Sequence, residues 1–157
     1  MPCRRSRAVA LAVLATTAAA AAAGCNAPRP ADLFLVERTG SIPGARLTLR
    51  LTDDGGAYCN DGRRAELTSA QLIDAREIRR ALDGGDDSAG NDDEKKALAK
   101  EHINLPPAAG ITSYQYRVRS QQGQVAFADT SKNQPEAFYK LAQLTREVAV
   151  KDCKLPR

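Results

Sequence analysis

The sequence predicts an α+β domain of two layers, in which an antiparallel sheet of four to five strands is covered by two helices. Two groups of short strands joined by tight turns are each followed by a stretch with helical periodicity. The strands alternate apolar and polar residues, which is typical of a sheet with one buried face. The strict strand and helix alternation of parallel folds is missing, so we expect antiparallel pairing, with the second sheet face exposed to solvent.

The first strands lie between residues 33 and 67. Residues 33–36 form a short apolar run, and the leucines of residues 47–52 alternate with polar residues, which predicts a strand with one buried face. Two aspartates and two glycines at 53–56 predict a hairpin turn. The return strand contains residues 58–59, and the dipeptide at 61–62 predicts another tight turn.

A first helix is predicted to begin at Thr68. Gln71 lies three residues later, so the two can form a capping box, in which each side chain bonds the backbone of the other. Gly84 is expected to end the helix. The apolar residues at spacings of three and four, which define the buried face, are Leu72, Ala75, Ile78 and Leu82.

The middle of the chain is polar. Residues 83–94 are acidic and rich in glycine, which predicts a loop. Residues 94–102 have a helix-forming composition and predict about two helical turns. Pro106 and Pro107 end this stretch, because proline cannot donate a backbone hydrogen bond.

The second half repeats the hairpin and helix order. In residues 114–119 the apolar side chains Tyr114, Tyr116 and Val118 alternate with polar ones, which predicts a strand with its tyrosines in the core. A turn at 121–123 leads to a return strand, and Asn133 is the expected N-cap of the last helix. The apolar face of that helix contains Phe138, Leu141, Leu144, Thr145 and Val148.

The N-terminus has the composition of an export signal. Arg4, Arg5 and Arg7 precede an apolar, alanine-rich run at 8–23. That run is shorter than the roughly 20 strongly apolar residues that span a bilayer. A basic start, a short apolar stretch and small residues at its end are typical of a secretory signal peptide.

The end of this leader, Ala22–Cys25, resembles the bacterial lipobox. Ala22 stands where that family most often has leucine. The resemblance implies that residues 1–24 are removed, that Cys25 carries the lipid, and that the protein is anchored on the extracytoplasmic face of the cell membrane. Residues 25–31 would then be a tether and residues 32–157 a single domain. The alternative is cleavage by the ordinary signal peptidase, which would release a soluble secreted protein.

Two cysteines remain in the domain, Cys59 and Cys153. Thiols in an oxidising compartment pair, so we expect a disulfide between them. The bridge would close a loop of about 95 residues and contribute about 4 to 5 kcal/mol in the chain-entropy model. A reactive or metal-binding role is the alternative, but neither cysteine lies in a CxxC pair.

The charge of the chain excludes a nucleic-acid-binding class. The full sequence has a net charge of +4, but the leader contains three of the 23 basic residues and none of the 19 acidic ones. The exported part is therefore nearly neutral, whereas phosphate binding needs clustered positive charge. The doublets Arg63-Arg64 and Arg79-Arg80 are expected to be solvated.

Two groups of residues are candidates for metal binding or catalysis. The acidic residues Asp86, Asp87, Asp92 and Asp93 are of the type that calcium prefers, although the loop has no EF-hand register, so calcium is a weak alternative to a solvated loop. His102 is the single histidine and has no GxSxG or HExxH motif around it. We therefore predict no catalytic residue, no cofactor and no metal.

The function expected from these features is a non-enzymatic envelope lipoprotein that binds a protein partner. The order of elements from Leu33 to Val150 also resembles that of emfourin-type inhibitors of thermolysin-like peptidases. The turn at 40–44 and the segments 68–82, 114–129 and 135–144 carry this resemblance. It implies a peptidase inhibitor as the alternative function and assigns no inhibitory residue. A carboxylate-based hydrolase is a third reading, but no acid pair stands out.

Overall fold

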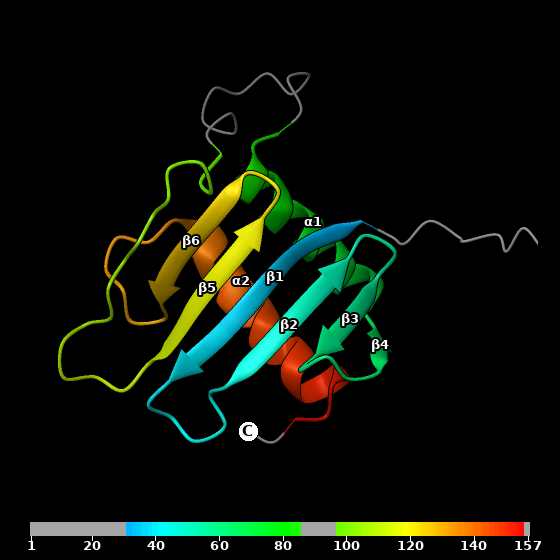
Figure 1. The fold of residues 1–157 in the computed structure, drawn as a ribbon, viewed down its shortest axis with the longest axis horizontal. Helices are drawn as coiled ribbons and strands as arrows, with labels where there is room; N and C mark the ends of the chain where they lie inside the picture. Colours follow the sequence, from blue (N-terminus) through cyan, green and yellow to red (C-terminus); the bar gives the residue numbers. More distant parts are fainter. Residues whose placement is uncertain (1–30, 86–96, 156–157) are drawn as a thin grey trace, which may run out of the picture.

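The computed structural model describes residues 31–85 and 97–155. These residues form one antiparallel sheet with the strand order β4-β3-β2-β1-β5-β6, and both helices pack on the same face (Figure 1). The α+β class and the two-layer arrangement are thus confirmed. In chain order the elements are β1 (Asp32–Gly40), β2 (Leu47–Thr52), β3 (Gly56–Cys59), β4 (Arg64–Glu66), α1 (Ser69–Asp83), β5 (Tyr114–Ser120), β6 (Gly123–Ala128), α2 (Glu136–Glu147) and the π-helical turn η1 (Val148–Asp152).

The predicted number of four to five strands was too low, because the sheet has six. The strand that the sequence did not reveal is β4. It has only three residues and no apolar alternation, and it forms because Ala65 pairs with Ala57 of β3. Asn60 and Asp61 reverse the chain between these strands with φ values of 52° and 55°, which asparagine and aspartate tolerate.

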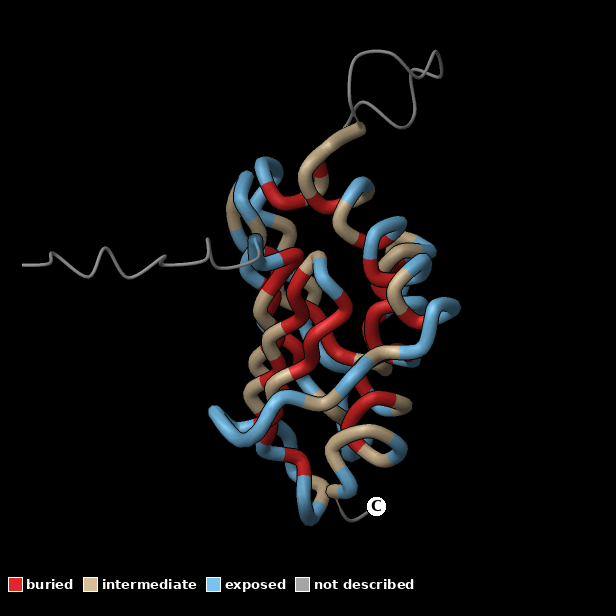
Figure 2. The backbone as a smooth tube through the Cα atoms, turned by 90° about the vertical axis from the view of Figure 1, so that its right-hand side faces the viewer, coloured by how far each residue is buried: buried red, intermediate tan, exposed pale blue. Residues whose placement is uncertain are grey.

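The core lies between the sheet and the helices (Figure 2). One row of paired residues crosses five strands on this inner face and is at most 9% exposed; it comprises Cys59, Leu49, Val36, Val118 and Val125. Three aromatic rings then stack from the sheet to α2. The ring centroids of Tyr116 and Phe127 are 5.0 Å apart, and those of Phe127 and Phe138 are 4.5 Å apart. Such pairs add to the free energy gained by burial alone.

Tyr116 is fully buried in this stack and is 1% exposed. Its hydroxyl has no hydrogen-bond partner within the described residues. Burial raises the pKa of Tyr116 to about 12, because the phenolate would lose its hydration. The predicted core position of this tyrosine is confirmed, and Tyr114 is partly buried on the same face.

Helix α1 begins as the sequence predicts. The Thr68 side chain accepts a hydrogen bond from the Gln71 backbone, and the Gln71 side chain accepts one from the Thr68 backbone at 2.8 Å. The Gln71 amide also donates to the Asp152 carboxylate at 2.8 Å, which ties the start of α1 to η1. Gly84 follows the helix with a φ of 82°, which a glycine adopts without strain.

The expected cap of α2 was wrong. The N-cap is Pro135, and Asn133 instead has a φ of 55° two residues before it. The buried Gln134 amide donates to the Ser131 carbonyl at 3.1 Å and so holds this turn in place. The predicted apolar face of α2 is buried.

The helix predicted at 94–102 is also absent from the part that the structure describes, where residues 98–102 form turns. The backbone amides of Leu98 and Ala99 donate to the carbonyls of Ala81 and Leu82 in the last turn of α1. These bonds satisfy carbonyls that the end of α1 leaves without partners. Tertiary pairing therefore overrides the local helical propensity of this segment.

The predicted disulfide is confirmed. Cys59 in β3 is bonded to Cys153 just after η1, with the Cα atoms 6.1 Å apart and a separation of 94 positions in the sequence. It fastens the C-terminal segment to the sheet, because the two cysteines lie on elements far apart in the chain. The bridge therefore strengthens the contact between the sheet and the helix layer that the apolar core also makes.

Candidate functional site

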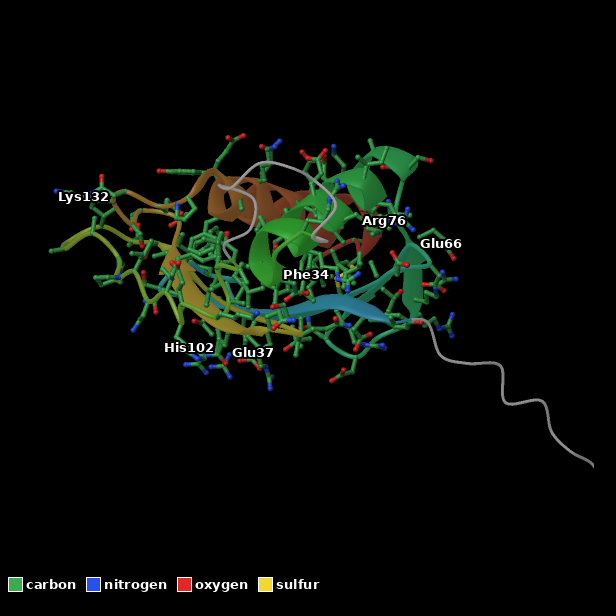
Figure 3. The ribbon with its side chains drawn as sticks, turned by 90° about the horizontal axis from the view of Figure 1, so that it is seen from above. Phe34, Glu37, Glu66, Arg76, His102 and Lys132 are labelled. Atoms are coloured by element: carbon green, nitrogen blue, oxygen red, sulfur yellow. A yellow bond between two sulfur atoms is a disulfide. The ribbon has the colours of Figure 1, made fainter. Side chains whose placement is uncertain are left out.

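The candidate site lies on the sheet face that the helices leave open. Figure 1 looks onto this face, and in Figure 3 Glu37 and His102 both lie on the side of the sheet away from the helices. Side chains alternate along each strand, so the residues between the core positions point outward. Three of the outward positions on β2 and β5 are arginines, namely Arg50, Arg117 and Arg119.

Glu37 is the acidic centre of this face. Its carboxylate lies 2.5 Å from the Arg119 guanidinium and 3.7 Å from that of Arg117. The strand register explains both contacts, because Glu37 lies directly opposite Arg117 and is diagonal to Arg119. Two positive side chains therefore share one negative side chain.

Arg50, the third outward arginine of β2 and β5, has its own partner. It lies 3.2 Å from the Asp32 carboxylate, and its guanidinium carbon is 4.1 Å from the centre of the Tyr58 ring. Arg64 in β4 likewise pairs with Asp54 and Glu66. Of these four arginines, only Arg117 and Arg119 share one carboxylate in the described residues, that of Glu37.

A groove of about 170 Å³ lies beside this pair. Glu37 and Thr39 of β1 line one side, and the segment 104–107 lines the other. Its floor is the outer surface of β5 and β6, where Gln115 and Arg117 lie opposite alanines. The groove therefore combines an acid, a guanidinium, two amides and a hydroxyl with small apolar surfaces.

The outer wall of the groove is held in place by hydrogen bonds. Asn104 forms a parallel bridge with Ala126, and the Leu105 backbone amide donates to the Ala126 carbonyl at 2.9 Å. The Ser131 hydroxyl, which has one proton to donate, lies 3.0 and 2.9 Å from the carbonyl oxygens of Leu105 and Pro106. The free edge of β6 is thus covered, and the wall runs alongside that strand in Figure 1.

The residues predicted for chemistry lie elsewhere. Cys25 and the calcium candidates Asp86, Asp87, Asp92 and Asp93 lie outside the described residues. His102 is exposed with a φ of 49° at the β5–β6 hairpin, and it does not line the groove. Within residues 31–85 and 97–155, no group of three or more histidine, cysteine, aspartate or glutamate side chains is placed to hold a metal ion.

Sequence reasoning missed the groove. The alternation over 114–119 correctly placed Gln115 and Arg117 on the outer face, but it gave no partner for them. Glu37 is 80 residues before Arg117, and only the register of β1 against β5 brings them together. The adjacent prolines at 106–107 were a usable signal for a rigid segment, and we interpreted them only as the end of a helix.

In the described residues, no helix is long and apolar enough to cross a membrane. Comparison with known proteins adds no relative: no family model, curated protein or solved structure matches this chain.

Proposed function

We propose that this chain is an exported lipoprotein, anchored through Cys25 on the extracytoplasmic face of the membrane, whose domain binds a protein partner through the open face of its sheet. The observation that carries the binding role is the contrast on one sheet between a fully packed inner face and a charged, grooved outer face. The role is non-enzymatic, since the residues of the groove form no acid, base and nucleophile constellation that we recognise.

The leader and the disulfide support the compartment. The leader has a basic start, a short apolar run and a lipobox-like end at Ala22–Cys25. The Cys59–Cys153 bridge fits the oxidising space outside the cytoplasm, because cytosolic reductants keep thiols reduced. The tether at 25–31 spans about 20 Å when extended, so the domain would remain near the membrane surface.

The open face supports the binding role. Its arginines, glutamate and tyrosine are partly exposed, and arginine and tyrosine are enriched where proteins contact each other. The groove wall is held by hydrogen bonds before any partner arrives, which lowers the entropy cost of binding. Exposed ion pairs of this kind contribute about 0 to 1 kcal/mol to folding, so stability alone does not require them.

The anchor is tested by mass spectrometry of the protein isolated from its own cells. We expect a chain that begins at Cys25, carries a thioether-linked lipid, and partitions with membranes. The variant Cys25→Ala, made in the full chain, is the matched control and should lose the lipid. A native chain that retains residues 1–24 and fractionates with the cytosol would refute the proposal.

The binding role is tested by crosslinking in intact cells, with a photoreactive amino acid placed at Gln115 on the open face or at Gln143 on the helix layer. We expect a defined crosslinked protein from the first position and none from the second. Equal crosslinking from both positions would contradict a role for the open face. Incubation of the same protein with a thermolysin-like peptidase tests the inhibitor alternative, which gains support only if the peptidase is slowed.

A further inference from the structure

The groove has an excess of positive charge at its rim. Arg119 donates a hydrogen bond to one carboxylate oxygen of Glu37. Arg117 lies 3.7 Å from the other oxygen and makes no hydrogen bond within the described residues. The Arg117 side chain is 61% exposed. A guanidinium has five N–H donors in a planar fork, and those of Arg117 are open to a second carboxylate.

The other arginines of the open face do not share this property. Arg50 has the carboxylate of Asp32, and Arg64 has those of Asp54 and Glu66. The face as a whole is therefore nearly balanced in charge, which argues against an anionic lipid surface as its ligand. The groove is the exception, because Arg117 and Arg119 together exceed the charge of Glu37 by one.

The shape of the groove favours an extended chain. Its floor follows β5, where Gln115 and Arg117 are two residues apart and point to the same side. Residues at this spacing in a strand match alternate side chains of an extended segment laid along it.

The lining supplies the right hydrogen-bonding groups for a peptide backbone. Thr39, Asn104 and Gln115 offer side-chain donors and acceptors from three sides. Pro106 and Pro107 are exposed, have no backbone N–H, and present apolar ring surfaces. The groove thus offers fixed polar groups beside small apolar surfaces, both of which an extended segment can contact.

We infer that this groove binds an extended segment of a partner protein and that Arg117 pairs with an acidic side chain of that segment. The inference rests on the proposed function and names the chemistry of the partner. Arg119 keeps Glu37 in place, so the carboxylate of the ligand replaces the long Glu37 contact of Arg117 and not the short contact of Arg119.

The test uses the full mature chain in detergent micelles. A phage library of random seven-residue peptides is selected against it, and a selected peptide is made in two forms, with its acidic residue kept or changed to the corresponding amide. Binding is measured by titration in ¹H–¹⁵N NMR spectra. We expect an acidic residue at one fixed peptide position, amide shifts at Thr39, Gln115 and Ala126, and about tenfold weaker binding of the amide form.

Variants sharpen this result. Arg117→Gln should bind both peptide forms equally, whereas Arg76→Gln is the matched control. Arg76 is also an exposed arginine and pairs with Asp53. It lies on α1, on the helix side of the sheet (Figure 3), so the tenfold preference should persist in this variant. Selection without any acidic position, equal binding of the two forms to the unchanged protein, or shifts outside the groove would each overturn the inference.

Two further measurements distinguish a lipid ligand from a peptide ligand and test the anchor separately from the groove. If phosphatidylglycerol vesicles without peptide shift the groove amides, the site faces lipid and the inference is wrong. Mass spectrometry of the N-terminus of protein isolated from its own cells reports on the anchor independently. If the chain is lipidated but binds no peptide, the inference about the groove is refuted and the proposed anchor stands. If the chain carries no lipid but binds the peptide, the anchor is refuted and the inference about the groove stands.

Discussion

The two faces of the sheet are built by the same strands and differ in almost every physical property. On the helix-covered face, the row from Cys59 to Val125 is almost entirely apolar and at most 9% exposed. On the open face, the row displaced by one residue contains Tyr58, Arg50, Leu35, Arg119 and Gln124. A shift of one residue along a strand thus exchanges apolar side chains for polar ones at every position of the row except Leu35.

This difference shows which face of the sheet stabilises the fold and which face is available for the proposed binding role. Burial of apolar surface contributes about 25 cal/mol per Å², and the inner face combines it with an aromatic stack and a disulfide. The ion pairs of the open face are exposed and contribute little to folding. We therefore expect substitutions on the inner face to change stability and substitutions on the open face to change binding.

Loss of the disulfide should have the largest effect. The double variant C59A/C153A removes the cross-link between two positions that are 94 residues apart in sequence. We expect the free energy of unfolding to fall by about 4 to 5 kcal/mol. Urea unfolding followed by circular dichroism measures this change. Thiol titration of the denatured, unreduced protein is the control, and two free thiols in the domain would show that the bridge is not formed.

The aromatic stack should come next. Phe138→Ala removes the α2 ring that packs on Phe127 and leaves a cavity, which should cost about 3 to 5 kcal/mol. The exposed aromatic residue next to it in α2 provides the comparison, since Tyr139→Ala should cost less than about 1 kcal/mol. Equal losses in the two variants would contradict the division between the inner layer and the surface.

Tyr116 should make stability depend on alkaline pH. Its folded-state pKa of about 12 is above the ordinary value of 10.0, so the folded protein retains a proton that the unfolded chain loses. The contribution is fully present below pH 10 and is lost as the pH rises toward 12, by about 2 to 3 kcal/mol. Urea midpoints from pH 8 to 11.5 should fall less steeply for Tyr116→Phe, and parallel curves for both proteins would disprove this account.

Tyr116→Phe should also leave the protein at least as stable at pH 8. The hydroxyl has no hydrogen-bond partner in the described residues, so its removal exposes no unpaired group. A loss of more than about 1 kcal/mol at that pH would reveal a partner, such as a bound water, that the hydroxyl contacts.

The smallest effect on stability is expected on the open face. Glu37→Gln removes two exposed ion pairs and should change the free energy of unfolding by less than about 1 kcal/mol. It should nevertheless raise the affinity of the groove for acidic peptides, because Arg117 loses its competing carboxylate. A destabilisation comparable to that of Phe138→Ala would show that this face contributes to folding after all.

Sequence alone determined the local features of this protein. The capping box of α1 depends on two residues three positions apart, the hairpins depend on short turns, and the inner faces depend on alternation within one strand or helix. The pairing of Cys59 with Cys153 followed from counting, because Cys3 lies in the predicted leader and Cys25 is expected to carry the lipid. The anchor at Cys25 rests on the leader pattern in the same way and stays a prediction.

Tertiary structure decided the features that depend on partners distant in the chain. Strand β4 exists because β3 lies beside it, and the groove exists because β1 pairs with β5. Residues 98–102 form turns because the Leu98 and Ala99 amides donate to the end of α1. Glu37 and Arg119 are 82 residues apart, and no local pattern encodes their contact. The physical reason is that side chains within one element meet at fixed spacings, whereas neighbours across a sheet are set by a register that the whole core selects.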